Sequence, residues 1–107
     1  MEESTFDFND GNGKVPAHRH ANGGGWVANT AHVADTAVVG KNAQVYRNAW
    51  VLGQALIFGE AKVSGKAWVL DDARVFGEAW ISGDVGVSGN TQVYGTAWIS
   101  WNAWVVY

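Results

Sequence analysis

A six-residue repeat runs through most of this chain. A valine or isoleucine recurs at every sixth position from Val27 to Ile99, without insertion, and Val105 lies in a last partial unit. A small residue, most often alanine, follows four positions later, and from Gly53 onwards glycine is common two positions later. An α-helix advances about 100° per residue, so it would scatter the β-branched residues over several faces and place glycine in its interior. The repeat therefore excludes a helical fold.

A coil with three short strands per turn satisfies the repeat. The β-branched residue points into the core, the small residue fits beside the corner, and glycine lets the backbone bend. One turn takes 18 residues, and residues 18 apart stack at the strand spacing of about 4.8 Å. We predict an all-β, single-domain parallel β-helix of about four turns over residues 26–107, preceded by an irregular N-terminal cap at residues 1–25.

The aliphatic residue, with the small residue four positions later, resembles the pattern of the hexapeptide-repeat, left-handed parallel β-helix family. The likeness covers residues 26–107. The opening segments Phe8–Gly13 and Asn22–Val27 look like the start of small hexapeptide-repeat proteins of bacteria and their phages. The resemblance implies a left-handed coil and a homotrimer, because proteins of this family commonly pack as trimers.

Composition narrows the classes of function. Hydrophobic residues make up 48% of the chain, charged residues 16%, and the net charge is −3. A binder of duplex nucleic acid needs a basic stripe, which this chain lacks. The absence of cysteine excludes a disulfide scaffold and a cysteine-ligated zinc site. We find neither a secretory signal nor an apolar run of membrane-spanning length, so we expect a cytoplasmic protein, in the host cytosol if it is phage-encoded.

Every third hexad shares a face of the coil, so the outward residues form columns. Seven tryptophans are present in the chain, and most of them fall in these columns. Columns of aromatic residues form contiguous apolar patches, and soluble monomers rarely expose such patches larger than a few hundred Å². We expect a homo-oligomer, a trimer, whose interface contains Leu56, Phe58, Phe76, Tyr94 and Tyr107. Tail-to-tail contact through the last turn is a further expectation.

One glycine interrupts the tryptophan column of the first face, which runs His32, Trp50, Trp68, Gly86 and Trp104. Trp68 and Trp104 lie two turns apart, roughly 9.6 Å. We predict that a small aromatic, nucleotide-like ligand stacks between them, with Trp50 and Ser88 at the edges of the slot. The alternative is that Gly86 only relieves crowding at a subunit interface.

His18, Arg19, His20 and His32 carry the remaining candidate chemistry. His18 and His20 project to the same side of an extended segment, which makes them weak candidates for a metal site. Two alternatives stand beside the metal. The side chains hydrogen-bond the cap to the first turn, or Arg19 and the backbone N–H groups of residues 23–25 bind an anion.

The family resemblance also bears on whether this protein is an enzyme. The best-known hexapeptide-repeat proteins are acyltransferases that use coenzyme A or an acyl carrier protein and a histidine base. The resemblance makes His32, the one histidine within the coil, the candidate base, but the repeat has no inserted loop to shape an acceptor pocket. We therefore predict a non-enzymatic oligomeric protein without cofactor. It would bind or sequester a small aromatic ligand or serve as an assembly module; an acyltransferase is the alternative.

Overall fold

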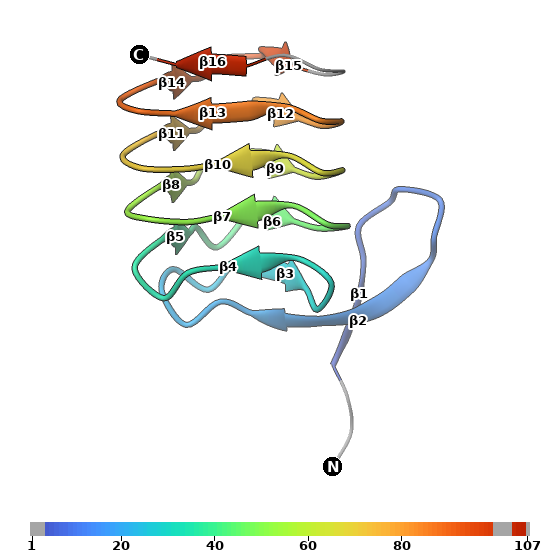
Figure 1. Ribbon diagram of the computed structural model, residues 1–107. Coiled ribbons are helices and arrows are strands. Elements are labelled where there is room, and N and C mark those ends of the chain that lie inside the picture. Colours follow the sequence, from blue (N-terminus) through green and yellow to red (C-terminus); the bar gives the residue numbers. More distant parts are fainter. Residues whose placement is uncertain (1–3, 100–103, 107) are drawn as a thin grey trace.

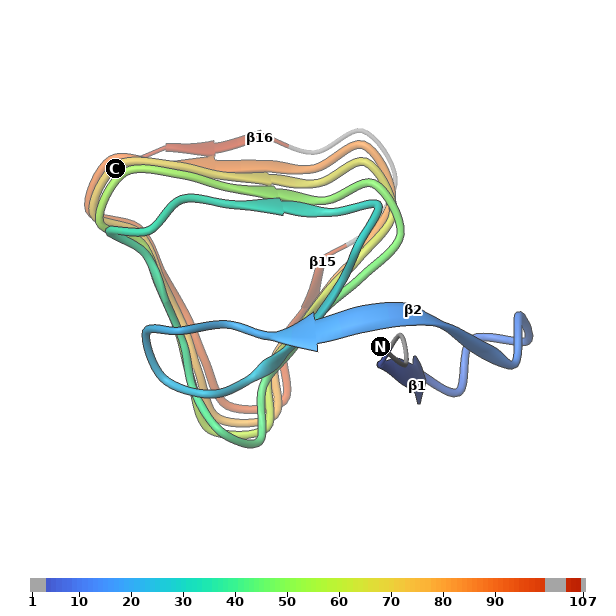
Figure 2. The ribbon, with the colours of Figure 1, turned by 90° about the horizontal axis from the view of Figure 1, so that it is seen from below.

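The repeat folds into a coil of stacked parallel strands. The computed structural model describes residues 4–99 and the backbone of residues 104–106, and within this part of the chain it contains strands and no helix. About four turns stack on one another (Figure 1), and the coil is triangular in cross-section (Figure 2). Strands 18 residues apart are neighbours, so Trp68 pairs with Trp50 on one side and with Gly86 on the other. The predicted parallel β-helix is confirmed.

Each side of the triangle is one sheet. The first face has the order β4 (His32–Val33), β7 (Trp50–Val51), β10 (Trp68–Val69), β13 (Gly86–Ser88) and β16 (Trp104–Val106). The third face has β5 (Val38–Val39), β8 (Leu56–Ile57), β11 (Arg74–Val75) and β14 (Gln92–Val93). The second face has β3 (Trp26–Ala28), β6 (Gln44–Val45), β9 (Lys62–Val63), β12 (Trp80–Ile81) and β15 (Trp98–Ile99), extended by β1 (Thr5–Asp7) and β2 (Lys14–Arg19).

The core is a column of aliphatic side chains inside the triangle. Val45, Val63 and Ile81, one above another on the second face, are all fully buried, as are the alanines beside the corners, such as Ala61. Burying one such valine or isoleucine contributes about 1.5–3 kcal/mol. The inward positions therefore supply much of the stability of the coil.

Close stacking explains the glycines at the corners. Gly65 has φ +72°, and a Cβ at this position would lie 2.5 Å from the backbone nitrogen of Gly83 in the next turn. Two corner positions hold a residue other than glycine in the same left-handed conformation. These residues are Arg47 and Asp71, and both have φ of 61°. A residue with a side chain pays about 1–2 kcal/mol for this conformation.

The N-terminal segment forms an arm on the outside of the coil. β1 and β2 pair as an antiparallel hairpin, and β2 pairs antiparallel with β3, with Ala17 opposite Ala28. Because β2 continues past the end of β3, the hairpin projects beyond the corner between the first and second faces (Figure 2). Phe6 and Phe8 then stack on the outward residues Trp26 and Tyr46, so they lie against the side of the second face.

Candidate functional site

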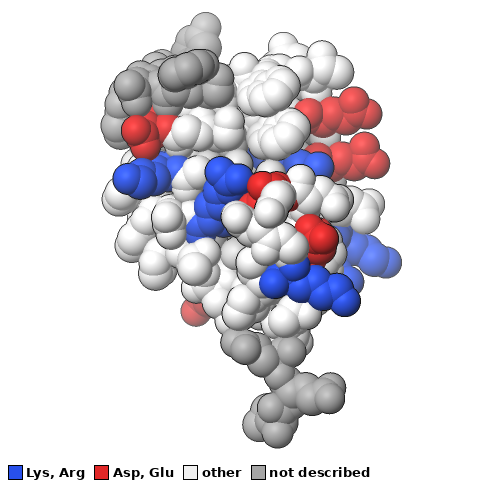
Figure 3. Space-filling model, turned by 90° about the vertical axis from the view of Figure 1, so that its right-hand side faces the viewer, with Lys and Arg blue, Asp and Glu red and all other residues white. Residues whose placement is uncertain are grey.

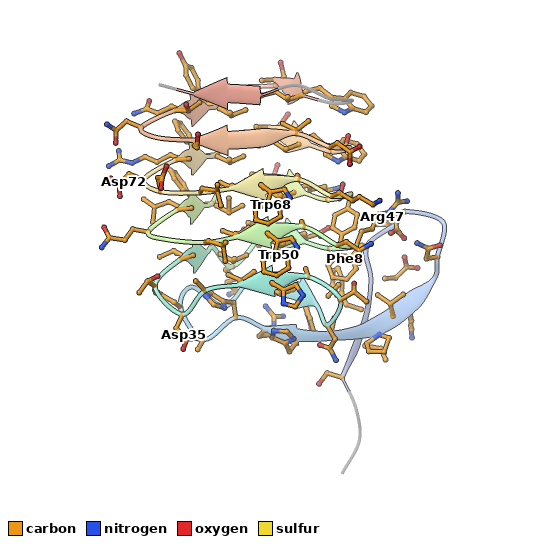
Figure 4. The ribbon with its side chains drawn as sticks, viewed as in Figure 1. Phe8, Asp35, Arg47, Trp50, Trp68 and Asp72 are labelled. Carbon is orange, nitrogen blue, oxygen red and sulfur yellow. The ribbon has the colours of Figure 1, made fainter. Side chains whose placement is uncertain are left out.

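The first three residues of the first-face column, His32, Trp50 and Trp68, form a stack of rings. His32 lies on Trp50 with ring centroids 4.0 Å apart, and Trp50 lies on Trp68 at 5.2 Å with only 6° between the planes. Figure 4 shows the two indoles one above the other on the outside of the coil. Both faces of Trp50 are covered by neighbours, whereas Trp68, 39% exposed, has Gly86 as its next neighbour in the sheet. Trp68 is thus the end of the described stack.

The predicted slot is only partly described. Gly86 is buried, and Ser88, beyond it on β13, is partly buried. β13 pairs with β16, which places Trp104 opposite Gly86, but the side chain of Trp104 lies outside the described residues. The described contact for a ligand ring is therefore the outer face of Trp68.

The third face carries an aromatic ridge made of Phe58, Phe76 and Tyr94. Their centroids are 4.8 and 5.4 Å apart, and the planes are within 12° of parallel. Phe58 is 37% exposed and Tyr94 60% exposed, while Phe76 between them is partly buried. Leu56 is partly buried on the same face, and Tyr107 lies outside the described residues. The three rings stack face to face, and their edges point outward.

The histidines near the N-terminus make structural contacts. His18 Nδ1 lies 2.7 Å from Asn29 Oδ1, and the buried His20 places Nε2 2.8 Å from the carbonyl oxygen of Ala37. Among the described residues, no group of three or more histidine, aspartate or glutamate side chains is arranged to hold a metal. These contacts fit the interpretation that His18 and His20 attach the cap to the first turn.

Arg19 is also engaged within the chain. Its guanidinium donates to the carbonyl oxygen of Gly24 at 2.9 Å and lies over the indole of Trp26. The backbone N–H groups of Gly24 and Gly25 donate to the carbonyl oxygens of His20 and Val39. Two of the three N–H groups of the predicted anion site are therefore engaged within the chain, and the anion site stays a prediction.

A cleft that the sequence did not predict lies between the arm and the coil. It has a volume of about 650 Å³ and lies beside the corner between the first and second faces. Its apolar lining comes from Phe8, Val15, Pro16, Ala28 and Tyr46, and its polar lining from Asp10, Asn12, Asn29, Thr30, Arg47 and Asn48. Figure 4 shows Phe8 and Arg47 at this place, where the arm meets the coil. One signal was visible in the sequence, since Arg47 stands where the repeat has glycine in many later corners.

The two groups with a resolved pKa shift both line this cleft. Burial raises the pKa of the Tyr46 phenol above its ordinary value, only partly offset by a hydrogen bond from Ser64. Burial alone would also raise the pKa of Asp10, but the backbone N–H of Asn12 and the guanidinium of Arg47 outweigh it and lower that pKa. Shifted pKa values concentrate at functional sites, so the cleft is a candidate site on physical grounds.

Two other hollows are more polar. A groove of about 690 Å³ follows the corner between the first and third faces, and Leu56 is its one apolar lining residue, beside Asp72, Arg74 and other polar side chains. A groove of about 400 Å³ follows the corner between the third and second faces, with Glu60, Lys62 and Glu78 in its lining. The second groove also includes Ala79 and Trp80, but polar side chains make up a larger share of both linings than of the cleft between the arm and the coil.

Comparison with known proteins finds no matching family model, no matching curated protein and no matching solved structure. The hexapeptide-repeat resemblance therefore stays a prediction, although the parallel β-helix is established. The described residues contain no helix that is long and apolar enough to cross a membrane.

Proposed function

We propose that this protein is a non-catalytic assembly module whose copies pack together through the third face. The observation that supports this is the aromatic ridge of Phe58, Phe76 and Tyr94. The three rings are locked by stacking on each other, so little side-chain entropy is lost when their edges are covered by a partner. The partner that covers the ridge is another copy of the chain, in a homotrimer.

Burial of the ridge provides the driving force. Apolar surface removed from water contributes about 25 cal/mol per Å², and aromatic side chains contribute the largest areas. The ridge itself carries no charge, which avoids the cost of desolvating an ion at the centre of the interface. Arg74 on β11 lies at the side of the ridge, where it can remain hydrated or pair with a carboxylate of the partner.

The mass of the protein in dilute neutral solution tests this proposal. The chain has a mass of 11.5 kDa, and light scattering is expected to return a multiple of it. Phe76→Asp places a charge in the middle of the ridge and should give monomers. Leu70→Asp is the matched control, because Leu70 occupies the equivalent outward position on the first face of the same turn and is also partly buried. A wild-type mass of one chain, or dissociation only in the Leu70 variant, contradicts assembly through the third face.

A second candidate function is the sequestration of a small aromatic, nucleotide-like ligand at the end of the first-face stack. The observation that favours it is that Trp68 stacks on Trp50 by one face and is followed in the sheet by a glycine. Stacking of a base on an aromatic side chain contributes about 1–3 kcal/mol. Tryptophan fluorescence should be quenched by a nucleotide in the wild type and not in Gly86→Trp, which supplies a ring of its own. Equal quenching in both proteins contradicts this function.

A further inference from the structure

We infer that the cleft between the N-terminal arm and the corner at Arg47 binds an uncharged planar heterocycle with a hydrogen-bonding edge. This site is separate from the third-face ridge and goes beyond the proposed function. The cleft forms where two parts of the chain meet, since residues 8–16 form one wall and residues 28–30 and 46–48 form the other. Its volume of about 650 Å³ falls within the range typical of small-molecule sites.

The floor of the cleft is rigid and apolar. Phe8 stacks on Tyr46 with centroids 4.8 Å apart and 17° between the planes, and both residues are only 2% exposed. Ala17 and Ala28 complete the same buried cluster, which is separate from the core of the coil. These side chains are almost fully buried, so they fix the shape of the cleft, and the apolar surface that a ligand meets comes from the partly buried Val15 and the exposed Pro16. Because the packing behind the cleft is preformed, little entropy is lost in ordering the site.

The backbone at the cleft is held in costly conformations. Asn9 and Arg47 have φ of 60° and 61°, and only Asp71 joins them among the described residues other than glycine. In many other corners of the coil the same conformation is taken by glycine, as at Gly53 and Gly65. Backbone strain of this kind concentrates at functional sites. At Arg47 the strain places a guanidinium at the mouth of the cleft, which glycine would not do.

Charge at the cleft is balanced. The Nε of Arg47 donates to Asp10 Oδ2 at 3.1 Å, and its Nη2 donates to the backbone oxygen of Asp10 at 3.2 Å. This is the one ion pair among the described residues. Figure 3 views the molecule from the side of the arm, where positive and negative side chains are interspersed and neither sign dominates. A site with one cation paired to one anion favours a ligand without net charge.

Three amides lie around the cleft, and parts of them have no partner within the described residues. The side chain of Asn48 makes no hydrogen bond there, Asn29 uses only its Oδ1, toward His18, and Asn12 uses only its Nδ2, toward Asp10. Free amide oxygens accept and free amide nitrogens donate, so together they can match the mixed donor and acceptor edge of a heterocycle. Asparagine recognises nucleobase edges by this chemistry.

Isothermal titration calorimetry with adenosine and uridine tests the inference, and adenosine monophosphate measures the effect of charge. Saturable binding of at least one nucleoside is expected, and it should be at least as strong as that of the monophosphate. Asn48→Ala should weaken binding about tenfold, the effect of losing roughly 1.4 kcal/mol of hydrogen bonding. Gln54→Ala is the matched control, because Gln54 is an exposed amide at the equivalent position of the next corner.

A second pair of variants separates binding from folding. Arg47→Gly restores the residue that the repeat uses in many corners, so the coil should stay folded while the guanidinium is lost. Asp71→Gly makes the same kind of change, at the same φ of 61°, far from the cleft. We expect weaker binding in the Arg47 variant and unchanged binding in the Asp71 variant.

Three results would overturn the inference. These are no binding of any of the three compounds, a preference for the monophosphate over the nucleosides, and loss of binding in Trp68→Leu with full binding in Asn48→Ala. The last result would place the ligand on the first face and support the second candidate function. None of these three results depends on the mass of the assembly, so ligand binding at the cleft and assembly through the third face are tested independently.

Discussion

Arg47 Nε lies 3.1 Å from Asp10 Oδ2 and joins two residues that are 37 positions apart in the chain. Arg47 belongs to the second turn of the coil, and Asp10 belongs to the turn of the arm hairpin. The side chain of Arg47 is 48% exposed and that of Asp10 only 11% exposed. This contact and the stacking of Phe8 on Tyr46 add to the pairing of β2 with β3 in attaching the arm to the coil, and they close the cleft on one side.

Protonation of Asp10 should loosen the arm. The pKa of Asp10 is lowered in the folded protein, because Asn12 and Arg47 together outweigh the effect of burial. A lowered folded pKa means that the pair stabilises the protein above the ordinary pKa of an aspartate, about pH 4. This contribution is lost as the pH falls through the lower, folded value. The size is about 0.5 kcal/mol, because the guanidinium is half exposed.

Asp10→Asn checks this expectation. The free energy of unfolding of the variant should be lower than that of the wild type at neutral pH, and the two should converge in acid. A difference that stays constant from neutral pH to pH 3 means that the ion pair does not stabilise the arm.

Deprotonation of Tyr46 should destabilise the protein at alkaline pH. Burial raises the pKa of the phenol, so the folded state disfavours the phenolate relative to the unfolded chain. The stability is therefore fully present below the ordinary pKa of tyrosine, about 10, and is lost as the pH rises through the higher, folded value. Tyr46→Phe removes this group and should lose less stability than the wild type above pH 10. The measurement is the free energy of unfolding from neutral pH to pH 11, with Tyr94→Phe as the exposed control.

Gly65→Ala should be strongly destabilising and Gly95→Ala much less so. Both glycines have a left-handed backbone, with φ of +72° and +69°, so that conformation destabilises both variants by about 1–2 kcal/mol. A Cβ at position 65 would also lie 2.5 Å from the nitrogen of Gly83, whereas a Cβ at position 95 would meet no atom within 4 Å. Thermal unfolding should separate the two variants by several degrees. Equal losses would show that the contact between turns is not the reason for glycine at position 65.

His20→Ala should destabilise the first turn by about 1–3 kcal/mol. The buried His20 ring is in hydrogen-bond contact with the carbonyl oxygen of Ala37, and the variant leaves that oxygen without this partner. His32→Ala is the comparison, since His32 is exposed and its ring stacks on Trp50. Amide hydrogen exchange should speed up in residues 20–39 of the first variant. Unchanged exchange there would contradict a role for His20 in attaching the cap.

The spacing of Val27, Val45 and Val63 by itself determined the coil. A residue type that repeats every six positions is buried in one core when each hexad supplies one strand of a coil. With three strands per turn, strand pairing and the outward columns follow from counting. The neighbours Trp50 and Trp68 were predictable for this reason, and the ring stack confirms them. The inward-facing and outward-facing positions needed no tertiary information.

The tertiary structure alone decided where the non-repeating segment packs. Residues 4–25 have no period, so nothing in their spacing indicates that Phe8 stacks on Tyr46 or that Asp10 pairs with Arg47. Those contacts arise because β2 pairs antiparallel with β3 in a register that carries the hairpin beyond the corner. The same limit applied to His20, whose partner is a backbone oxygen that no side-chain pattern reveals. Counting residues predicts neighbours within a repeat, whereas contacts between a repeat and an irregular segment depend on the shape of both surfaces.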